Sequence, residues 1–316
     1  MRTEAISAAI ESYLSVPDSA DPSTLKFFEG LWDLQATIAV GAAPYVAPNV
    51  ADATALARTV TPIFVEYKPV VDRERMLDAM SRIATYVADM AGLAADQVEA
   101  LRSADFGRAL DSYDLSLAPT NLFDFIETSY VAMVGEDGAL APAVYAMVAT
   151  AALSPLISGA AHDAVSAIDE KELSVLEPGT CPVCGEPATL SWVGDRTSLQ
   201  GGDRRLWCGL CHTDWPYGRV RCARCGSRSS TVLRYTHTEE DPGHRLHVCD
   251  ACHGYIRTVF KDEVPHMFSP LVEEVVSSHL HAAAAELGYT PAGDGAAAAV
   301  PSAEYVDEPV DLDGTF

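Results

Sequence analysis

Lysine is scarce in this chain of 316 residues, and positive charge is correspondingly limited. Lysine and arginine together number 21 against 45 aspartates and glutamates, which gives a formal net charge of −24. A surface of this sign repels nucleic acid and anionic lipid at long range. The composition therefore argues against a nucleic-acid-binding protein. The four lysines are Lys26, Lys68, Lys171 and Lys261.

The N-terminus lacks the features of a secretory signal. The segment after Met1 is amphipathic, with no apolar stretch that leads to a small-residue cleavage site. One uncharged run, from Gly138 to Ala161, is long enough to cross a bilayer. It is rich in alanine, contains Pro142 and Pro155, and has no flanking lysine or arginine. We expect a helix buried in a bundle, no membrane insertion and a cytoplasmic location.

Motifs of catalysis are also missing. We find no nucleophile–base pair, no phosphate loop and no dinucleotide fingerprint. Apolar residues of the first half recur at helical spacing, as at Phe27, Leu31 and Leu34, which is typical of a core face. His162, which precedes Asp163, is expected to be a structural or surface residue. These absences predict that the protein is not an enzyme.

Cysteine, in contrast, is concentrated in one stretch. All eight cysteines lie in four Cys-x-x-Cys pairs, and 23 residues separate the first pair from the second in each half of the stretch. The second half repeats the first at an offset of 41 residues, which indicates a duplicated metal-binding unit. The pairs are Cys181/Cys184, Cys208/Cys211, Cys222/Cys225 and Cys249/Cys252.

The pair spacing is typical of a tetrahedral site with four thiolate ligands. Two residues between the cysteines let both sulfurs point at one ion, and two such knuckles complete the site. Gly185 and Gly226 follow the opening pair of each unit, where a tight turn needs a positive φ. We therefore expect one four-cysteine site in each unit and two bound ions. Zinc and iron both suit such a site.

Other roles for the cysteines fit less well. Disulfides need an oxidising compartment. Thioredoxin-type pairs lie at the start of a helix in a βαβ unit, whereas these pairs flank predicted hairpins. The haem-attachment motif Cys-x-x-Cys-His occurs twice but leaves the other two pairs unused, and one eight-thiolate cluster would not need the repeat. Four cysteines on each ion leave no open position for catalysis.

The patterns along the chain predict an α+β fold. Asp72 precedes one clear helix, and alternating or β-branched residues predict strands at 189–193, 203–207, 231–235, 244–248 and 255–260. The expected helix after Asp72 buries Met76, Met80, Ile83, Val87 and Met90 on one face. We expect a helical domain at 1–175, cysteine modules at 176–217 and 218–262, a C-terminal helix at 263–290 and an acidic flexible tail at 291–316.

Four arginines cluster where the two cysteine units meet. They are Arg219, Arg221, Arg224 and Arg228. Between Cys181 and Phe260 there are ten arginines against eight acidic residues, so this region is basic in a strongly acidic chain. One interpretation is a solvated and partly paired arginine face. The alternative is a patch that docks an acidic segment of a partner protein.

The cysteine region resembles one known family, the formate dehydrogenase accessory protein FdhE. The similarity rests on Cys181–Gly185, Leu206–Trp215, Arg219–Gly226 and Val248–Val259, and it continues to Leu287-Gly288-Tyr289. One departure is Asp214, where the family pattern has glutamate before the tryptophan.

The resemblance implies a cytoplasmic, non-catalytic assembly factor. It implies a helical domain, two rubredoxin-like modules with iron at the four-cysteine sites, and an interaction with the catalytic subunit of formate dehydrogenase late in its maturation. From the residues alone, the ion in these sites is either zinc or iron. Two other functions also remain open, a rubredoxin-like electron carrier and a zinc-ribbon nucleic-acid-binding protein.

Overall fold

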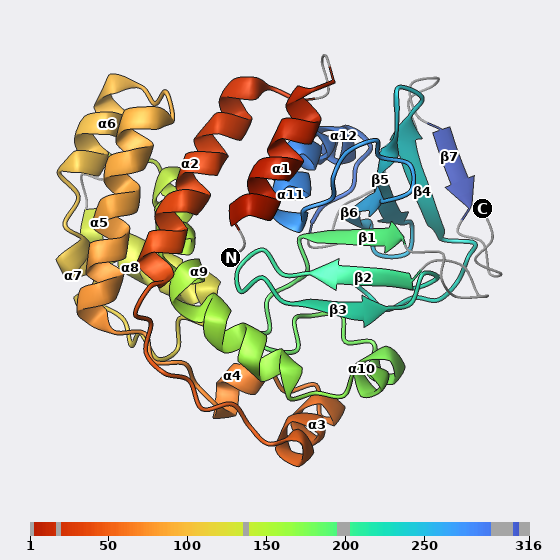
Figure 1. Cartoon of the computed structure of the whole chain (residues 1–316), viewed down its shortest axis with the longest axis horizontal. Coiled ribbons are helices and arrows are strands. Elements are labelled where there is room, and N and C mark those ends of the chain that lie inside the picture. The colour runs from red at the N-terminus through yellow and green to blue at the C-terminus, as the bar shows by residue number, and fades with distance from the viewer. Residues whose placement is uncertain (1–2, 17–19, 135–138, 195–202, 292–305, 310–316) are drawn as a thin grey trace.

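The structure is a computed structural model that describes residues 3–16, 20–134, 139–194, 203–291 and 306–309. Helices fill the first half of the chain, and strands with two further helices follow (Figure 1). The helices of the first half are α1 (Thr3–Leu14), α2 (Pro22–Ala39), α3 (Val50–Arg58), α4 (Ile63–Glu66), α5 (Arg73–Met90), α6 (Ala95–Arg102), α7 (Phe106–Asp111), α8 (Leu122–Val134), α9 (Pro142–Ser166) and α10 (Glu170–Leu176).

Helix α5 shows how local sequence sets these elements. The side chain of Asp72 accepts a hydrogen bond from the backbone N–H of Arg75 and so caps the helix at its start. The apolar face is buried at Met76, Met80, Ile83 and Val87, as the spacing predicts. Met90 differs, because it lies in the last turn and is 49% exposed.

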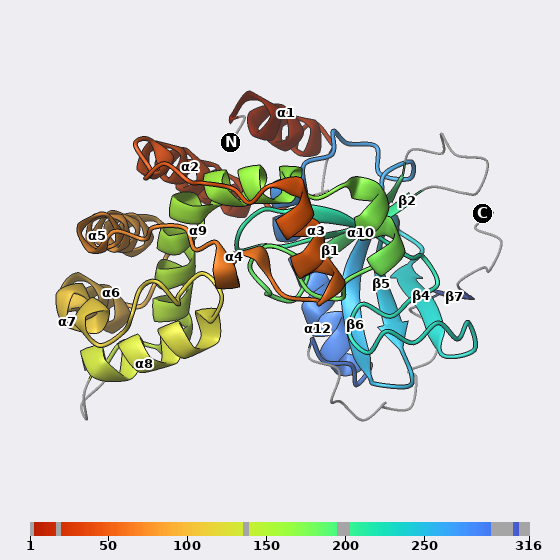
Figure 2. The same cartoon turned by 90° about the horizontal axis from the view of Figure 1, so that it is seen from below.

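Helix α9 is the central helix of the first half. It has the length and composition to cross a membrane, but 56% of its most apolar window is buried inside the protein. It packs against α2, α5 and α8 and lies between these helices and the sheet (Figure 2). The expected burial of this apolar run in a bundle is therefore confirmed.

Pro155 lies inside α9 and leaves one carbonyl without its helical partner. Proline has no N–H, so the carbonyl four residues earlier, at Ala151, loses its hydrogen bond. The side-chain amide of Gln35 in α2 donates to this carbonyl at 2.8 Å, and Gln35 is itself buried. The two helices are thus joined where the proline interrupts α9.

The strands form one sheet in the order β3-β2-β1-β6-β5-β4-β7. The first cysteine unit supplies β1 to β3 and the second supplies β4 to β6, and β1 pairs in parallel with β6. The sheet therefore runs continuously through both units, which the repeat did not reveal. The strands are β1 (Leu190–Gly194), β2 (Asp203–Trp207), β3 (Asp214–Tyr217), β4 (Leu233–Thr238), β5 (Asp241–Cys249), β6 (Gly254–Phe260) and β7 (Val306–Pro309).

Two strands were not expected from the sequence. Strand β3 contains Pro216, which a sheet tolerates best at an edge, and β3 ends the sheet order. Strand β7 lies within the tail that was expected to be flexible and pairs antiparallel with β4. The expectation is wrong for Val306–Pro309, because β4 offers unpaired backbone groups to them. The rest of the tail after residue 291 lies outside the described residues.

The C-terminal helical segment is divided into α11 (Pro270–Val276), a 3-10 turn (Ser277–His279) and α12 (Leu280–Glu286). The helical residues thus run from Pro270 to Glu286 inside the expected 263–290 segment, and the 3-10 turn interrupts the single helix that was expected. Gly288, at φ 79°, lies just beyond the helical residues, where glycine adopts a left-handed conformation without strain. Leu280 and Ala284 of α12 pack in one cluster with Leu246 and Val248 of β5 and Tyr255 of β6.

We predict that Gln35→Leu lowers the free energy of unfolding by about 1–3 kcal/mol, because it leaves the buried carbonyl of Ala151 without a donor. Urea denaturation of the metal-loaded protein measures this change. Asp33→Asn is the control, because Asp33 is exposed on the same helix. Equal stability of the two variants would show that the amide does not support α9.

Candidate metal centres

The first cysteine cluster lies in the main hydrophobic core. It contains Cys181, Cys184, Cys208 and Cys211, all buried. The sulfur–sulfur distances are 3.5 Å for Cys181–Cys211 and for Cys184–Cys208. A disulfide would bring two sulfurs to about 2.05 Å, whereas four sulfurs about 2.3 Å from one ion are about 3.8 Å apart. The geometry thus fits a metal ion and not disulfides.

The second cluster repeats this arrangement with more exposure. Cys222, Cys225, Cys249 and Cys252 group together, and the sulfur–sulfur distances are 3.8 Å for Cys222–Cys252 and for Cys225–Cys249. Cys225 is exposed and Cys252 is partly exposed. The structure therefore brings together the eight predicted ligands in the predicted two sets, and each set can hold one ion.

The residue after each pair takes a left-handed backbone conformation. Gly185 and Gly226 have φ of 88° and 74°, and His212 and His253 have φ of 61° and 52°. The sequence prediction recognised the glycines only. Histidine is one of the few other residues that is enriched in this region of φ. The histidines that suggested a haem motif thus complete the same knuckle turn.

Backbone hydrogen bonds close these turns. The N–H groups of Gly185, His212 and Gly226 donate to the carbonyls of the first cysteine of their pairs at 2.9, 2.9 and 3.0 Å. In the second cluster, the N–H of Arg224 also donates to Cys222 Sγ at 3.3 Å. Donors aimed at sulfur stabilise the thiolate, which is the form that binds a metal.

The first cluster favours a cation on electrostatic grounds. Burial raises the pKa of Cys181, but hydrogen bonds from Cys184, Cys208 and Cys211 outweigh it and hold that pKa well below its usual range. The same sulfur contacts raise the pKa of Cys184 and of Cys208 well above the usual range, so the buried sulfurs do not all ionise without a compensating cation. An isolated buried charge is costly unless it is paired. A metal ion at the centre of the four sulfurs supplies the compensating charge.

The helical half holds the first cluster directly. The backbone N–H groups of Ile63 and Phe64, at the start of α4, donate to the carbonyls of Pro182 and Val183 at 3.0 and 2.9 Å. The first N–H groups of a helix have no partner within the helix. The knuckle between Cys181 and Cys184 therefore satisfies donors of α4, a contact that the sequence did not predict.

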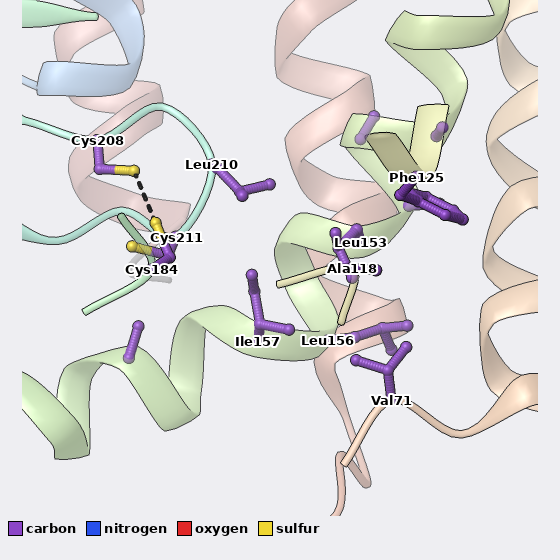
Figure 3. Close-up of a cluster of buried hydrophobic side chains, with 14 of the residues drawn as sticks. Val71, Ala118, Phe125, Leu153, Leu156, Ile157, Cys184, Cys208, Leu210 and Cys211 are labelled. Carbon is purple, nitrogen blue, oxygen red and sulfur yellow. Dashed lines mark hydrogen bonds between the residues drawn. The ribbon is translucent and has the colours of Figure 1, made fainter. Parts of the chain in front are cut away.

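The knuckle between Cys208 and Cys211 contacts α9. Leu210 extends from this knuckle toward Leu153 and Ile157 of α9 (Figure 3). His212 Nε2 lies 3.2 Å from the hydroxyl of Ser154, and its ring stacks on Trp207 with centroids 5.4 Å apart. Burial lowers the pKa of His212 to about 4, so the ring is neutral at pH 7.

The arginines at the junction of the units are largely engaged within the chain. Arg221 and Arg228 bind the Glu177 carboxylate at 2.9 and 2.6 Å, and Arg221 also donates to the Glu177 carbonyl at 2.9 Å. Arg224 is partly buried and donates to the carbonyl of Tyr255 at 3.1 Å. Arg219 also makes contacts within the chain. Arg228 is the most open of the paired arginines, with its side chain 64% exposed.

These features define an α+β protein with two four-cysteine clusters that can each hold an ion. Residues 180–219 match the family model described as "FdhE, central domain". The chain is 31% identical over 126 residues to the "Protein FdhE homolog" of Shewanella oneidensis and 32% identical over 111 residues to that of Aquifex aeolicus. These alignments span 40% and 38% of the two relatives and 40% and 34% of this chain.

The fold is similar over nearly the whole chain. The crystal structure of the FdhE protein from Pseudomonas aeruginosa matches with a TM-score of 0.56 at 19% identity, over 93% of this chain and 95% of that one. The resemblance to the FdhE family is thus confirmed by sequence in the cysteine region, and beyond it the likeness is one of fold alone.

We predict that Cys181→Ser removes one metal equivalent from each chain, because each unit supplies its own four ligands. Cys222→Ser, at the equivalent position of the second unit, should also remove one. Metal analysis of the purified variants measures this. Loss of both ions from either variant would mean that the two sites depend on each other.

We also predict that the two ions leave at different rates. A chelator should remove metal from the second site first, because Cys225 and Cys252 are accessible and the first cluster is buried. A colorimetric chelator should record two phases, and Cys222→Ser should abolish the fast one. A single phase for both ions in the wild-type protein would contradict this order.

Proposed function

We propose that this protein is an accessory factor that binds the catalytic subunit of formate dehydrogenase and supports its maturation. The observation that carries the proposal is the match to FdhE at residues 180–219, which supply the ligands of the first cluster. The second cluster repeats the same arrangement. We propose a cytoplasmic location and no catalytic activity of its own.

The proposed role of the metals is structural. Each unit is a rubredoxin-like module of about 40 residues, a size that rarely folds without a metal or disulfide. Because the ligands converge only in the folded chain, metal binding contributes directly to folding. Iron is the ion that the family resemblance favours, and zinc suits the same four sulfurs. The ions thereby shape the surface that a partner meets.

A rubredoxin-like electron carrier is the second candidate function. The exposure of Cys225 favours it, because an accessible ligand shortens the path for electron exchange at that site. An electron carrier would show a reversible Fe(III)/Fe(II) couple and would turn over with a reductase. An assembly factor requires neither property. A nucleic-acid-binding zinc ribbon is disfavoured by the net charge of −24.

The test is affinity capture from native cytoplasm, with the metal content of the bait measured in parallel. Recovery of a formate dehydrogenase catalytic subunit is the expected result. Enrichment of nucleic acid or ribosomes in its place would reject the accessory function.

The same capture tests the arginine patch. We propose that Arg219, Arg221, Arg224 and Arg228 contribute to docking, mainly through the exposed Arg228. Arg219→Ala/Arg228→Ala should weaken capture roughly two- to fivefold, since an exposed ion pair contributes up to about 1 kcal/mol, and metal content should stay the same. The matched control is Arg58→Ala/Arg102→Ala, because these arginines are exposed and paired on the helical half. Equal capture by both variants would exclude the patch.

A further inference from the structure

A cavity of ≈620 Å³ has none of the cluster cysteines in its lining. Its walls come from α1, the start of α2, the turn between β4 and β5, the loop that follows β6, and the end of α11. Cavities of about 300–1,000 Å³ are the usual size for small-ligand sites in proteins. Neither the metal sites nor the accessory function accounts for it.

Four polar side chains form a connected network, and three of them, Tyr13, Asp241 and His244, line this cavity. Tyr13 donates to the Glu273 carboxylate at 2.7 Å, and its hydroxyl lies 3.2 Å from His244 Nε2. His244 Nε2 lies 2.8 Å from Glu273, and His244 Nδ1 lies 2.9 Å from Asp241. The network joins α1, α11 and the start of β5, which are distant in the sequence.

The network carries a net negative charge. Burial lowers the pKa of His244, but hydrogen bonds to Asp241 and Glu273 outweigh it and raise that pKa to about 9. One imidazolium therefore balances two carboxylates incompletely. Glu273 is fully buried and lies behind the cavity lining, and its Oε1 has no hydrogen-bond partner among the described residues. Its negative charge acts on the cavity through Tyr13 and His244, which do line it.

The groups around the network add to this charge. Acidic side chains line the cavity at Asp21, Glu240 and Glu263, and Glu263 is paired with Arg245. His266 and His279 also line it, and the ring of His266 stacks on Tyr13 with centroids 3.9 Å apart. Lysine and arginine are absent from the described lining. Apolar walls come from Leu25, Val264, Val275 and Val276.

We infer that this cavity binds an alkyl cation, that is, a guanidinium or ammonium group on a short aliphatic chain. The lining carboxylates of Asp21, Glu240 and Asp241 receive the charged group. The apolar walls accept the methylene chain, as lysine and arginine stems pack on apolar surfaces. The cation is either a free small molecule or a basic side chain of a polypeptide. The inference does not depend on the proposed accessory function.

The test is calorimetric titration of the metal-loaded full-length protein. Agmatine represents the free cation, and acetyl-Gly-Arg-Gly-amide represents a basic side chain. Saturable binding of either probe is the expected result, and the tighter one identifies the source. Binding should also shift the His244 ring signals in the NMR spectrum. Absence of saturable binding by both probes would overturn the inference.

Charge reversal at the rim distinguishes binding of the cation in this cavity from nonspecific attraction of the cation to an acidic protein. Glu240→Lys places a competing cation at the cavity and should weaken binding roughly tenfold or more. Glu127→Lys makes the same change at an exposed position of α8, outside the cavity lining, and should leave affinity unchanged. Metal content confirms that both variants fold. Equal weakening by the two substitutions would reject a site at this cavity.

Discussion

The burial of four sulfurs in the main core is the constraint on which the rest of the structure depends. The first cluster lies where the helical half meets the sheet, and both halves supply its surroundings. Four thiols in an apolar region gain most when they share a cation. The start of α4 donates to one knuckle and α9 packs on the other, so the helical half and the metal site stabilise each other.

The second cluster shows that duplication in sequence need not give equal sites. Both sets of sulfurs have similar spacing, and the turns after the pairs share the same backbone conformation. The difference comes from what covers them, because helices pack against the first knuckles while Cys225 remains exposed. The same ligands can therefore hold one ion as part of the core and the other near solvent. The two sites therefore differ in the exposure of their sulfurs to solvent and not in the type of ligand.

Local patterns predicted several helices of the first half, among them α2, α5 and α9, and the grouping of the eight cysteines into two sets. Periodicity located Met76 and Met80 in the core, and the repeat assigned each cysteine to its cluster. Contacts between distant segments were not predictable in this way. Gln35 reaches Ala151, far along the chain, for a reason that only the packing of α2 on α9 reveals. Glu177 likewise receives two of the junction arginines, which the sequence could show only as a cluster of charge.

The parallel pairing of β1 with β6 has a consequence for how the chain folds as it is synthesised. Leu190 pairs with Arg257, so β1 has one free edge until the second unit has emerged. At ~5–20 residues per second this interval lasts roughly 3–13 s. An unpaired strand edge is a template for association with other chains. The first unit thus passes through a period in which this edge is open to other chains until β6 pairs with it.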